Sequence, residues 1–115
     1  MGDRGEVVLI EGGVADNALP IRLYTHWGAS ELHTVVANAL KRGKGRWGDD
    51  SYLNRIIFSE MIKDNVEGET GYGITIGESG DAWRIIFVNH GEQVVTDTSL
   101  AGQWTFEEYV ETFAE

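Results

Sequence analysis

Hydrophobic and polar positions alternate in patterns that divide the chain into two strands, two helices, three strands and a last helix. A β-branched run at Glu6–Ile10 and an extended segment at Ile21–Trp27 are most simply paired as a hairpin across a polar loop at 13–19. Strands and helices in separate runs, in the order ββααβββα, indicate one α+β domain over residues 1–115. We expect about five mostly antiparallel strands with the helices packed on one face.

Two central helices are predicted from apolar residues that recur every three or four positions. The first begins after Ser30, a favoured N-cap residue, and ends at Gly43. The second begins after residues 49–51 and continues to about Asp64, with an apolar stripe that includes Leu53. The segment 41-KRGKGRWG-48 joins the two helices.

Three further strands are predicted at 71–77, 82–89 and 92–99, where ESGD and HG between them are typical of hairpin turns. The strand at 82–89 is apolar on both faces, which predicts a central position. Thr105 and Glu108 have the spacing of a capping box. They predict a short terminal helix.

Candidate chemistry begins in the stretch 22-RLYTHWGAS-30. Period two places Arg22, Tyr24 and His26 on one face of the second strand. The third strand has a small face, which would leave room for a ligand or another chain if it lay beside this row; an ordinary solvated face with glycines that permit twist is the alternative. The small-face residues are Gly71, Gly73, Thr75 and Gly77.

Glu60 lies within the apolar stripe of the second helix. A carboxylate facing a core must be paired or protonated. We expect a structural pair with Arg22, Arg55 or Arg84; a raised pKa useful for proton transfer is the alternative.

No cofactor or metal site is expected. His26 is suited to be a general base, and His33 follows it closely in the sequence. However, the histidines show no HExxH or HxH pairing, and a third ligand is undefined. Walker and GxSxG patterns are absent from the sequence as well.

The net charge of −10 makes nucleic acid an unlikely partner, although Lys41, Arg42, Lys44 and Arg46 form a basic segment between the central helices. Trp47 next to them favours a protein partner or a homodimer contact. The chain has no cysteine, signal-peptide pattern or apolar run long enough to span a membrane. These features predict a soluble cytoplasmic protein.

The opening MGDR, the Y-x-H-W motif at 24–27 and the later GYGI at 71–74 resemble a family of small uncharacterised phage and prokaryotic proteins that begin MG(N/D)R. The resemblance covers about half of the chain and implies no established activity. It marks as site residues Gly2, Arg4, Tyr24, His26, Trp27 and Gly73. Gly28-Ala29-Ser30 stands where some family members have a second glycine.

Two functions fit these patterns. The first is a small acidic binding protein, phage-like or encoded by a mobile element, that docks on a host protein through an open face bearing Tyr24 and His26. The second is a hydrolase or nucleotide-modifying enzyme with His26 as general base. In the second, Tyr24 and Arg22 orient an anionic group and Glu60 is a buried partner. This function requires Tyr24 and His26 in a closed cleft with Arg22 or Glu60 within hydrogen-bond reach.

Overall fold

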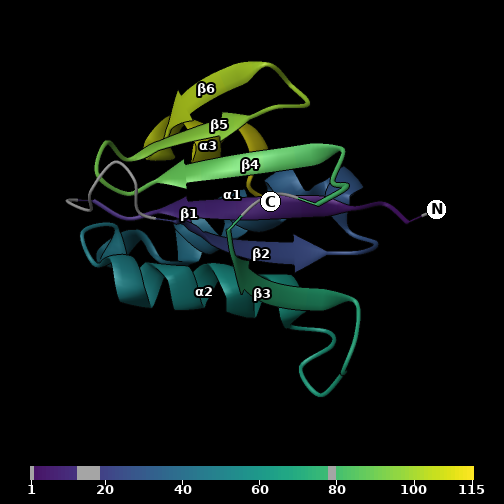
Figure 1. Cartoon of the computed structure of the whole chain (residues 1–115). Helices are drawn as coiled ribbons and strands as arrows, with labels where there is room; N and C mark the ends of the chain where they lie inside the picture. Colours follow the sequence, from purple (N-terminus) through teal and green to yellow (C-terminus); the bar gives the residue numbers. More distant parts are fainter. Residues whose placement is uncertain (1, 13–18, 78–79) are drawn as a thin grey trace.

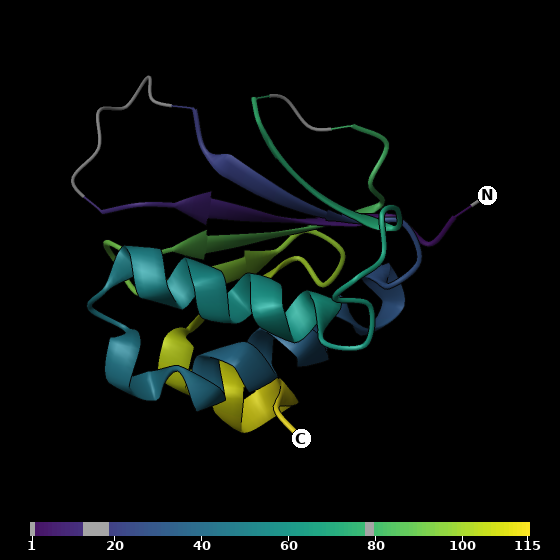
Figure 2. The same ribbon diagram turned by 90° about the horizontal axis from the view of Figure 1, so that it is seen from below.

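A six-stranded mixed sheet forms one layer of the protein, and three helices cover one of its faces (Figures 1 and 2). The computed structural model describes residues 2–12, 19–77 and 80–115. The expected α+β architecture, with helices on one face, is confirmed. The strands are β1 (Gly5–Ile10), β2 (Ile21–Thr25), β3 (Tyr72–Ile76), β4 (Arg84–Asn89), β5 (Val94–Asp97) and β6 (Gly102–Thr105). The helices are α1 (Leu32–Arg42), α2 (Asp50–Ile62) and α3 (Phe106–Phe113), with 3-10 turns η1 (Ala29–Glu31) and η2 (Lys44–Arg46).

The core lies between the sheet and the helices. Alternate residues of the inner strands, such as Val7, Leu23 and Ile86, meet the apolar faces of the three helices there. None of the helices in the described ranges combines the length and the apolar character that crossing a bilayer requires.

The capping box predicted for the last helix is confirmed. The Thr105 hydroxyl accepts a hydrogen bond from the Glu108 amide at 3.1 Å, and the Thr105 amide donates to the Glu108 carboxylate at 2.9 Å. Two amides that the helix itself cannot satisfy are paired in this way. The cap therefore fixes where the chain turns from β6 into α3.

The N-cap role predicted for Ser30 is wrong. Ser30 lies inside η1, and its amide donates to the Asp3 carboxylate at 2.8 Å while the Ala29 amide donates to the Asp3 carbonyl oxygen at 3.0 Å. An ionised carboxylate accepts a stronger hydrogen bond than a hydroxyl does. The N-terminal segment therefore supplies the acceptors at this turn.

The sheet order is β3-β2-β1-β4-β5-β6, so the predicted hairpin between the third and fourth strands is wrong. The β1–β2 and β4–β5 hairpins and the central position of β4 are confirmed. However, β3 pairs with β2, and β4 pairs in parallel with β1. The hairpin does not form because β1 is buried in the sheet and pairs on both of its sides, with β2 on one side and with β4 on the other. A sixth strand, β6, was not predicted, and residues 13–18 of the expected loop and 78–79 of the ESGD turn lie outside the described residues.

The chain crosses from β3 to β4 over the face of the sheet that has no helices, here called the open face (Figure 2). An ion pair attaches this crossover to the sheet: an Arg22 terminal nitrogen lies 2.9 Å from a Glu6 carboxylate oxygen. Arg22 Nε also donates to the Gly77 carbonyl, and the Gly80 amide donates to the other Glu6 oxygen at 3.0 Å. Only 13% of the Arg22 side chain and 5% of the Glu6 side chain are exposed.

Replacing Arg22 alone should strongly destabilise the protein. We expect Arg22→Met to lower the free energy of unfolding by about 3 kcal/mol, because it leaves the Glu6 carboxylate buried without its counter-charge. The double variant Glu6→Leu/Arg22→Met should recover more than half of that loss. Urea denaturation measures both values, and a double variant less stable than Arg22→Met would show that the pair is not the linked unit described here.

Candidate functional site

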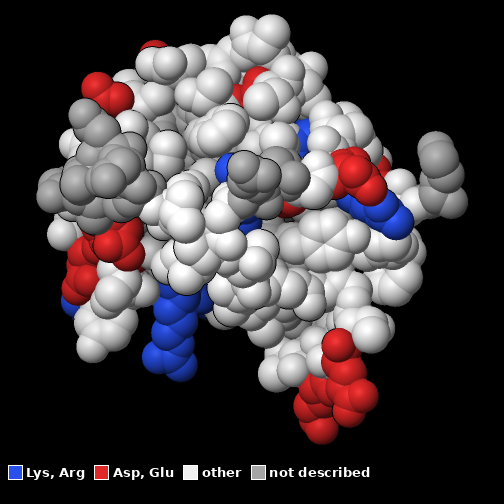
Figure 3. All heavy atoms as spheres, viewed as in Figure 1, with Lys and Arg blue, Asp and Glu red and all other residues white. Residues whose placement is uncertain are grey.

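Among the described strand residues that face the open side of the sheet, Glu6 and Arg22 are the charged ones, and their charges cancel. The strand registers place these side chains on it: Glu6, Val8, Ile10, Arg22, Tyr24, Gly73, Thr75, Ile85, Phe87, Asn89, Val94, Thr96, Gln103 and Thr105. Figure 3, which views this face, shows mostly white atoms around small charged patches near its centre and most of the visible acidic residues at its periphery. A neutral sheet face on a chain of charge −10 is a candidate for protein contact, since such contacts are depleted in charged residues at their centre.

The small face of β3 does lie beside the polar row of β2. Tyr24 is opposite Gly73 and Arg22 is opposite Thr75 in the antiparallel register. A Cβ atom at Gly73 would meet no heavy atom within 4 Å. Glycine at this position is therefore not required by packing, and it leaves space beside the Tyr24 ring.

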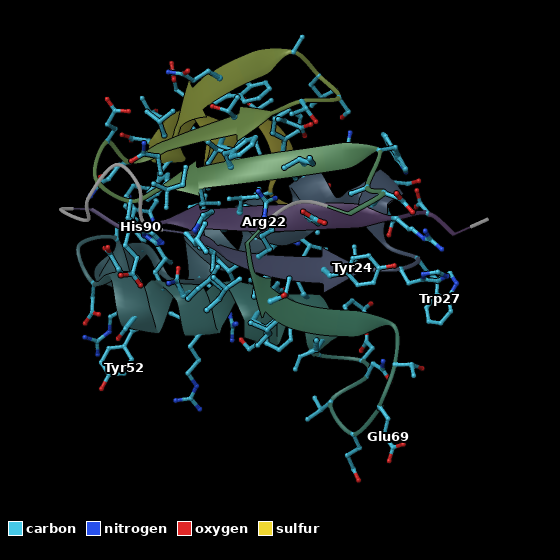
Figure 4. All side chains as sticks on the ribbon, in the orientation of Figure 1. Arg22, Tyr24, Trp27, Tyr52, Glu69 and His90 are labelled. Carbon is cyan, nitrogen blue, oxygen red and sulfur yellow. The ribbon has the colours of Figure 1, made fainter. Side chains whose placement is uncertain are left out.

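Tyr24 and His26 act as one unit, since a hydrogen bond of 2.7 Å joins the Tyr24 hydroxyl and His26 Nδ1. The N-terminal segment packs on the same imidazole, because a Cβ at Gly2 would lie 2.8 Å from His26 Nε2 and 2.6 Å from the His26 carbonyl oxygen. Both side chains are half-buried. Tyr24 lies toward the Trp27 end of β2, away from the centre of the sheet where Arg22 lies (Figure 4).

Trp27 lies beside His26 at the edge of this region. Its indole is 63% exposed and forms an edge-to-face contact with the His26 ring, with ring centroids 4.7 Å apart. Gly71 beside it has a φ of 95°, and a Cβ there would lie 2.7 Å from a Trp27 ring atom. Both the backbone conformation and the close approach therefore require glycine at 71.

Five of the six residues marked by the family resemblance gather in one place, which we call the Tyr24 corner: Gly2, Tyr24, His26, Trp27 and Gly73. Arg4, the sixth, contacts the segment before β4 instead: its carbonyl oxygen accepts the Trp83 amide at 3.1 Å, and its side chain forms an ion pair with Asp81. Asp3 accepts a hydrogen bond from the Trp83 indole at 2.7 Å. Hydrogen bonds from Ser30 lower the pKa of Asp3.

The other members of the expected catalytic group are not available at this corner. The Arg22 guanidinium is bound by Glu6 and the Gly77 carbonyl. Glu60 is paired, as expected, but with Arg42 at 3.4 Å and Lys63 at 2.9 Å on the helical side, and with none of the three arginines proposed for it. Arg42 could not be chosen from sequence because the packing of α1 against α2 selects it, whereas Lys63 follows Glu60 by three residues, a helical spacing that the sequence does show.

His33 belongs to a second group of polar residues, on the helical side of the sheet. Its Nδ1 accepts a hydrogen bond of 2.7 Å from Arg84. Arg84 also lies 3.6 Å from the buried Asp97 carboxylate and donates to the Ala29 carbonyl. This group connects η1, α1, β4 and β5, so it has a structural role. Among the described residues, no group of three or more His, Cys, Asp or Glu side chains is arranged to hold a metal ion.

The basic segment and Trp47 have different surroundings. The Trp47 indole is half-buried, donates to the Leu40 carbonyl at 2.9 Å and packs against Phe106, so packing accounts for this tryptophan without a partner. Arginines from the segment instead line a cleft with Arg55 and Tyr52 of α2. This cleft was not predicted from the sequence, because it forms only where α1 and α2 pack together and bring Arg42 and Arg55 to the same side.

No protein-family model, curated protein or solved structure matches the chain. Residue geometry therefore carries the functional argument.

His90 is buried at the end of β4, where its Nε2 donates to the Asn54 side-chain oxygen at 2.6 Å and its Nδ1 lies 3.7 Å from Asp50. Burial lowers the pKa of His90 from its ordinary value of 6.5, and burial also lowers the pKa of His33. Below pH 6.5 these two histidines are protonated more readily in the unfolded chain than in the folded protein, where their pKa values are lower. Stability should therefore fall as the pH drops through that value.

We expect the free energy of unfolding to decrease between about pH 7.5 and about pH 5.5. His90→Gln should reduce this slope by up to about 1.4 kcal/mol per pH unit, because glutamine can donate to Asn54 but does not titrate. Urea denaturation at a series of pH values measures the slope. An unchanged slope in His90→Gln would contradict the assignment, and Asp3 does not interfere because its lowered pKa lies below this range.

Proposed function

We propose that this protein is a binding protein that docks on a host protein through the β3 side of its sheet, next to the Tyr24 corner. The observation that carries the proposal is that β3 is an exposed edge strand. This strand is an edge of the sheet, and its side chains Ile74 and Ile76 are 61% and 64% exposed. Proteins bind extended partner segments at such edges by forming a further row of backbone hydrogen bonds.

Within the described strand β3, the usual sequence features that oppose strand pairing are missing. Sequences normally guard an exposed edge with charged residues, proline, a bulge or a covering segment. The β3 sequence YGITI has no charge and no proline, and its partner β2 lies on the other side. The opposite edge, β6, has only four residues, and its Trp104 packs on the core. The β3 edge is therefore the better docking site.

The charge of the chain indicates the kind of partner. Two copies that each carry −10 repel one another over most of their surfaces, which disfavours a homodimer through β3. The same charge accelerates encounter with a basic protein. A partner that offers an extended apolar segment flanked by basic residues matches both the neutral edge and the acidic periphery. The resemblance to phage proteins agrees with a host target in the cytoplasm.

A small hydrolase or nucleotide-modifying enzyme is the second proposal, and the 2.7 Å hydrogen bond between Tyr24 and His26 is the observation that favours it. A tyrosine so placed can orient the imidazole of a general base. The proposal lacks a second catalytic group, since Arg22 and Glu60 are committed to other partners. We therefore favour the binding function.

The edge proposal is tested by affinity capture from a prokaryotic cell extract, followed by direct titration of the purified partner. Ile74→Lys should weaken binding by about tenfold or more, because a lysine on an edge strand opposes strand addition. Leu100→Lys is the matched control: it replaces another exposed apolar residue, in the turn between β5 and β6, and should stay within about twofold. A partner that binds Ile74→Lys as tightly as it binds the unchanged protein would overturn the proposal.

The enzyme alternative is tested with ester and phosphoester substrates. Under the binding proposal, the unchanged protein and His26→Ala should show the same background turnover. A rate that exceeds background and falls about a hundredfold or more in His26→Ala, with a smaller loss in Tyr24→Phe, would replace the binding proposal with the enzymatic one.

A further inference from the structure

A cleft on the helical side gathers arginines from three consecutive elements. Its volume is about 600 Å³, and it is lined by Arg42 at the end of α1, Arg46 in η2, and Tyr52, Arg55, Ile56 and Ser59 of α2. Every charged residue in this lining is an arginine. Clefts of roughly 300–1,000 Å³ accommodate small-molecule ligands.

The arginines are held in place to different degrees. Arg42 donates to the Ile56 carbonyl at 3.0 Å and to the Ser59 hydroxyl, which fixes its guanidinium on the cleft wall. The Arg46 guanidinium lies 5.0 Å from the centre of the Tyr52 ring, a cation–π contact that leaves its N–H groups free to donate sideways. Figure 4 shows Tyr52 projecting from α2 at the end of the molecule opposite Trp27.

Two of these cations have no carboxylate partner among the described residues. The ion pairs of the described chain include Arg42 with Glu60, but none with Arg46 or Arg55. This is unexpected in a chain with 19 carboxylates and nine cations. Gathering like charges costs free energy that a bound anion would offset.

We propose that this cleft binds the phosphate group of a small phosphorylated molecule. Guanidinium groups match phosphate oxygens with paired N–H donors, and the Tyr52 hydroxyl can supply a further donor. The negative charge elsewhere on the protein opposes a long nucleic acid, whereas a small ligand needs only the local field of the cleft. The site lies apart from β3 and does not depend on the docking function proposed above.

Isothermal titration calorimetry with inorganic pyrophosphate at low ionic strength tests this site. The unchanged protein should bind pyrophosphate, and Arg55→Gln and Arg46→Gln should each weaken binding about tenfold or more. Arg55→Lys should restore only part of the loss, because lysine keeps the charge but not the paired donors. The midpoint of the unfolding transition, measured for each variant without ligand, checks that the variant is folded.

Lys44→Gln is the matched control, because Lys44 is an exposed cation of η2 that does not line the cleft. It should bind pyrophosphate within about twofold of the unchanged protein. The proposal is overturned if the unchanged protein binds no pyrophosphate, or if Lys44→Gln loses as much affinity as Arg55→Gln. Citrate bound as tightly as pyrophosphate would overturn the assignment to phosphate.

Discussion

The buried ion pair between Glu6 and Arg22 is the interaction on which the arrangement of the open face depends. The pair joins β1 to β2. The Glu6 carboxylate also accepts a hydrogen bond from the Gly80 amide of the crossover, and Arg22 donates one to the Gly77 carbonyl. Gly77 and Gly80 of the crossover are both held there, and β3, next to β2, is at the edge of the sheet. The same pair occupies the arginine that an active site around His26 would need.

The two candidate sites lie on different parts of one fold and offer different kinds of interaction. The β3 side is neutral, and its exposed Ile74 and Ile76 offer backbone pairing and apolar contact. The cleft between the α1–α2 connection and α2 is cationic and offers guanidinium donors. A chain with a strongly acidic surface thus has one surface suited to a protein and another suited to a small anion.

Local patterns predicted most elements and failed where distant residues decide. The capping box at Thr105 and Glu108 was predicted because both partners lie within one helical turn. The cap at Ser30 was wrong because Asp3, far away in sequence, supplies the acceptor. The parallel pairing of β1 with β4 has no local sequence signal. Strand periodicity predicted that Arg22, Tyr24 and His26 share one face, whereas the position of Tyr24 beside Gly73 and the pairing of Arg22 with Glu6 depend on the sheet register.

Amide hydrogen exchange on the protein alone and in complex with its purified partner tests the central claim most directly. The outward amides of β3 have no strand beyond them in the free protein, so they should exchange quickly and become protected when a partner strand pairs with them. We expect the largest slowing at Tyr72–Ile76, with smaller effects at the Tyr24 corner. Slowing confined to α1 and α3, with β3 unchanged, would contradict docking through this edge.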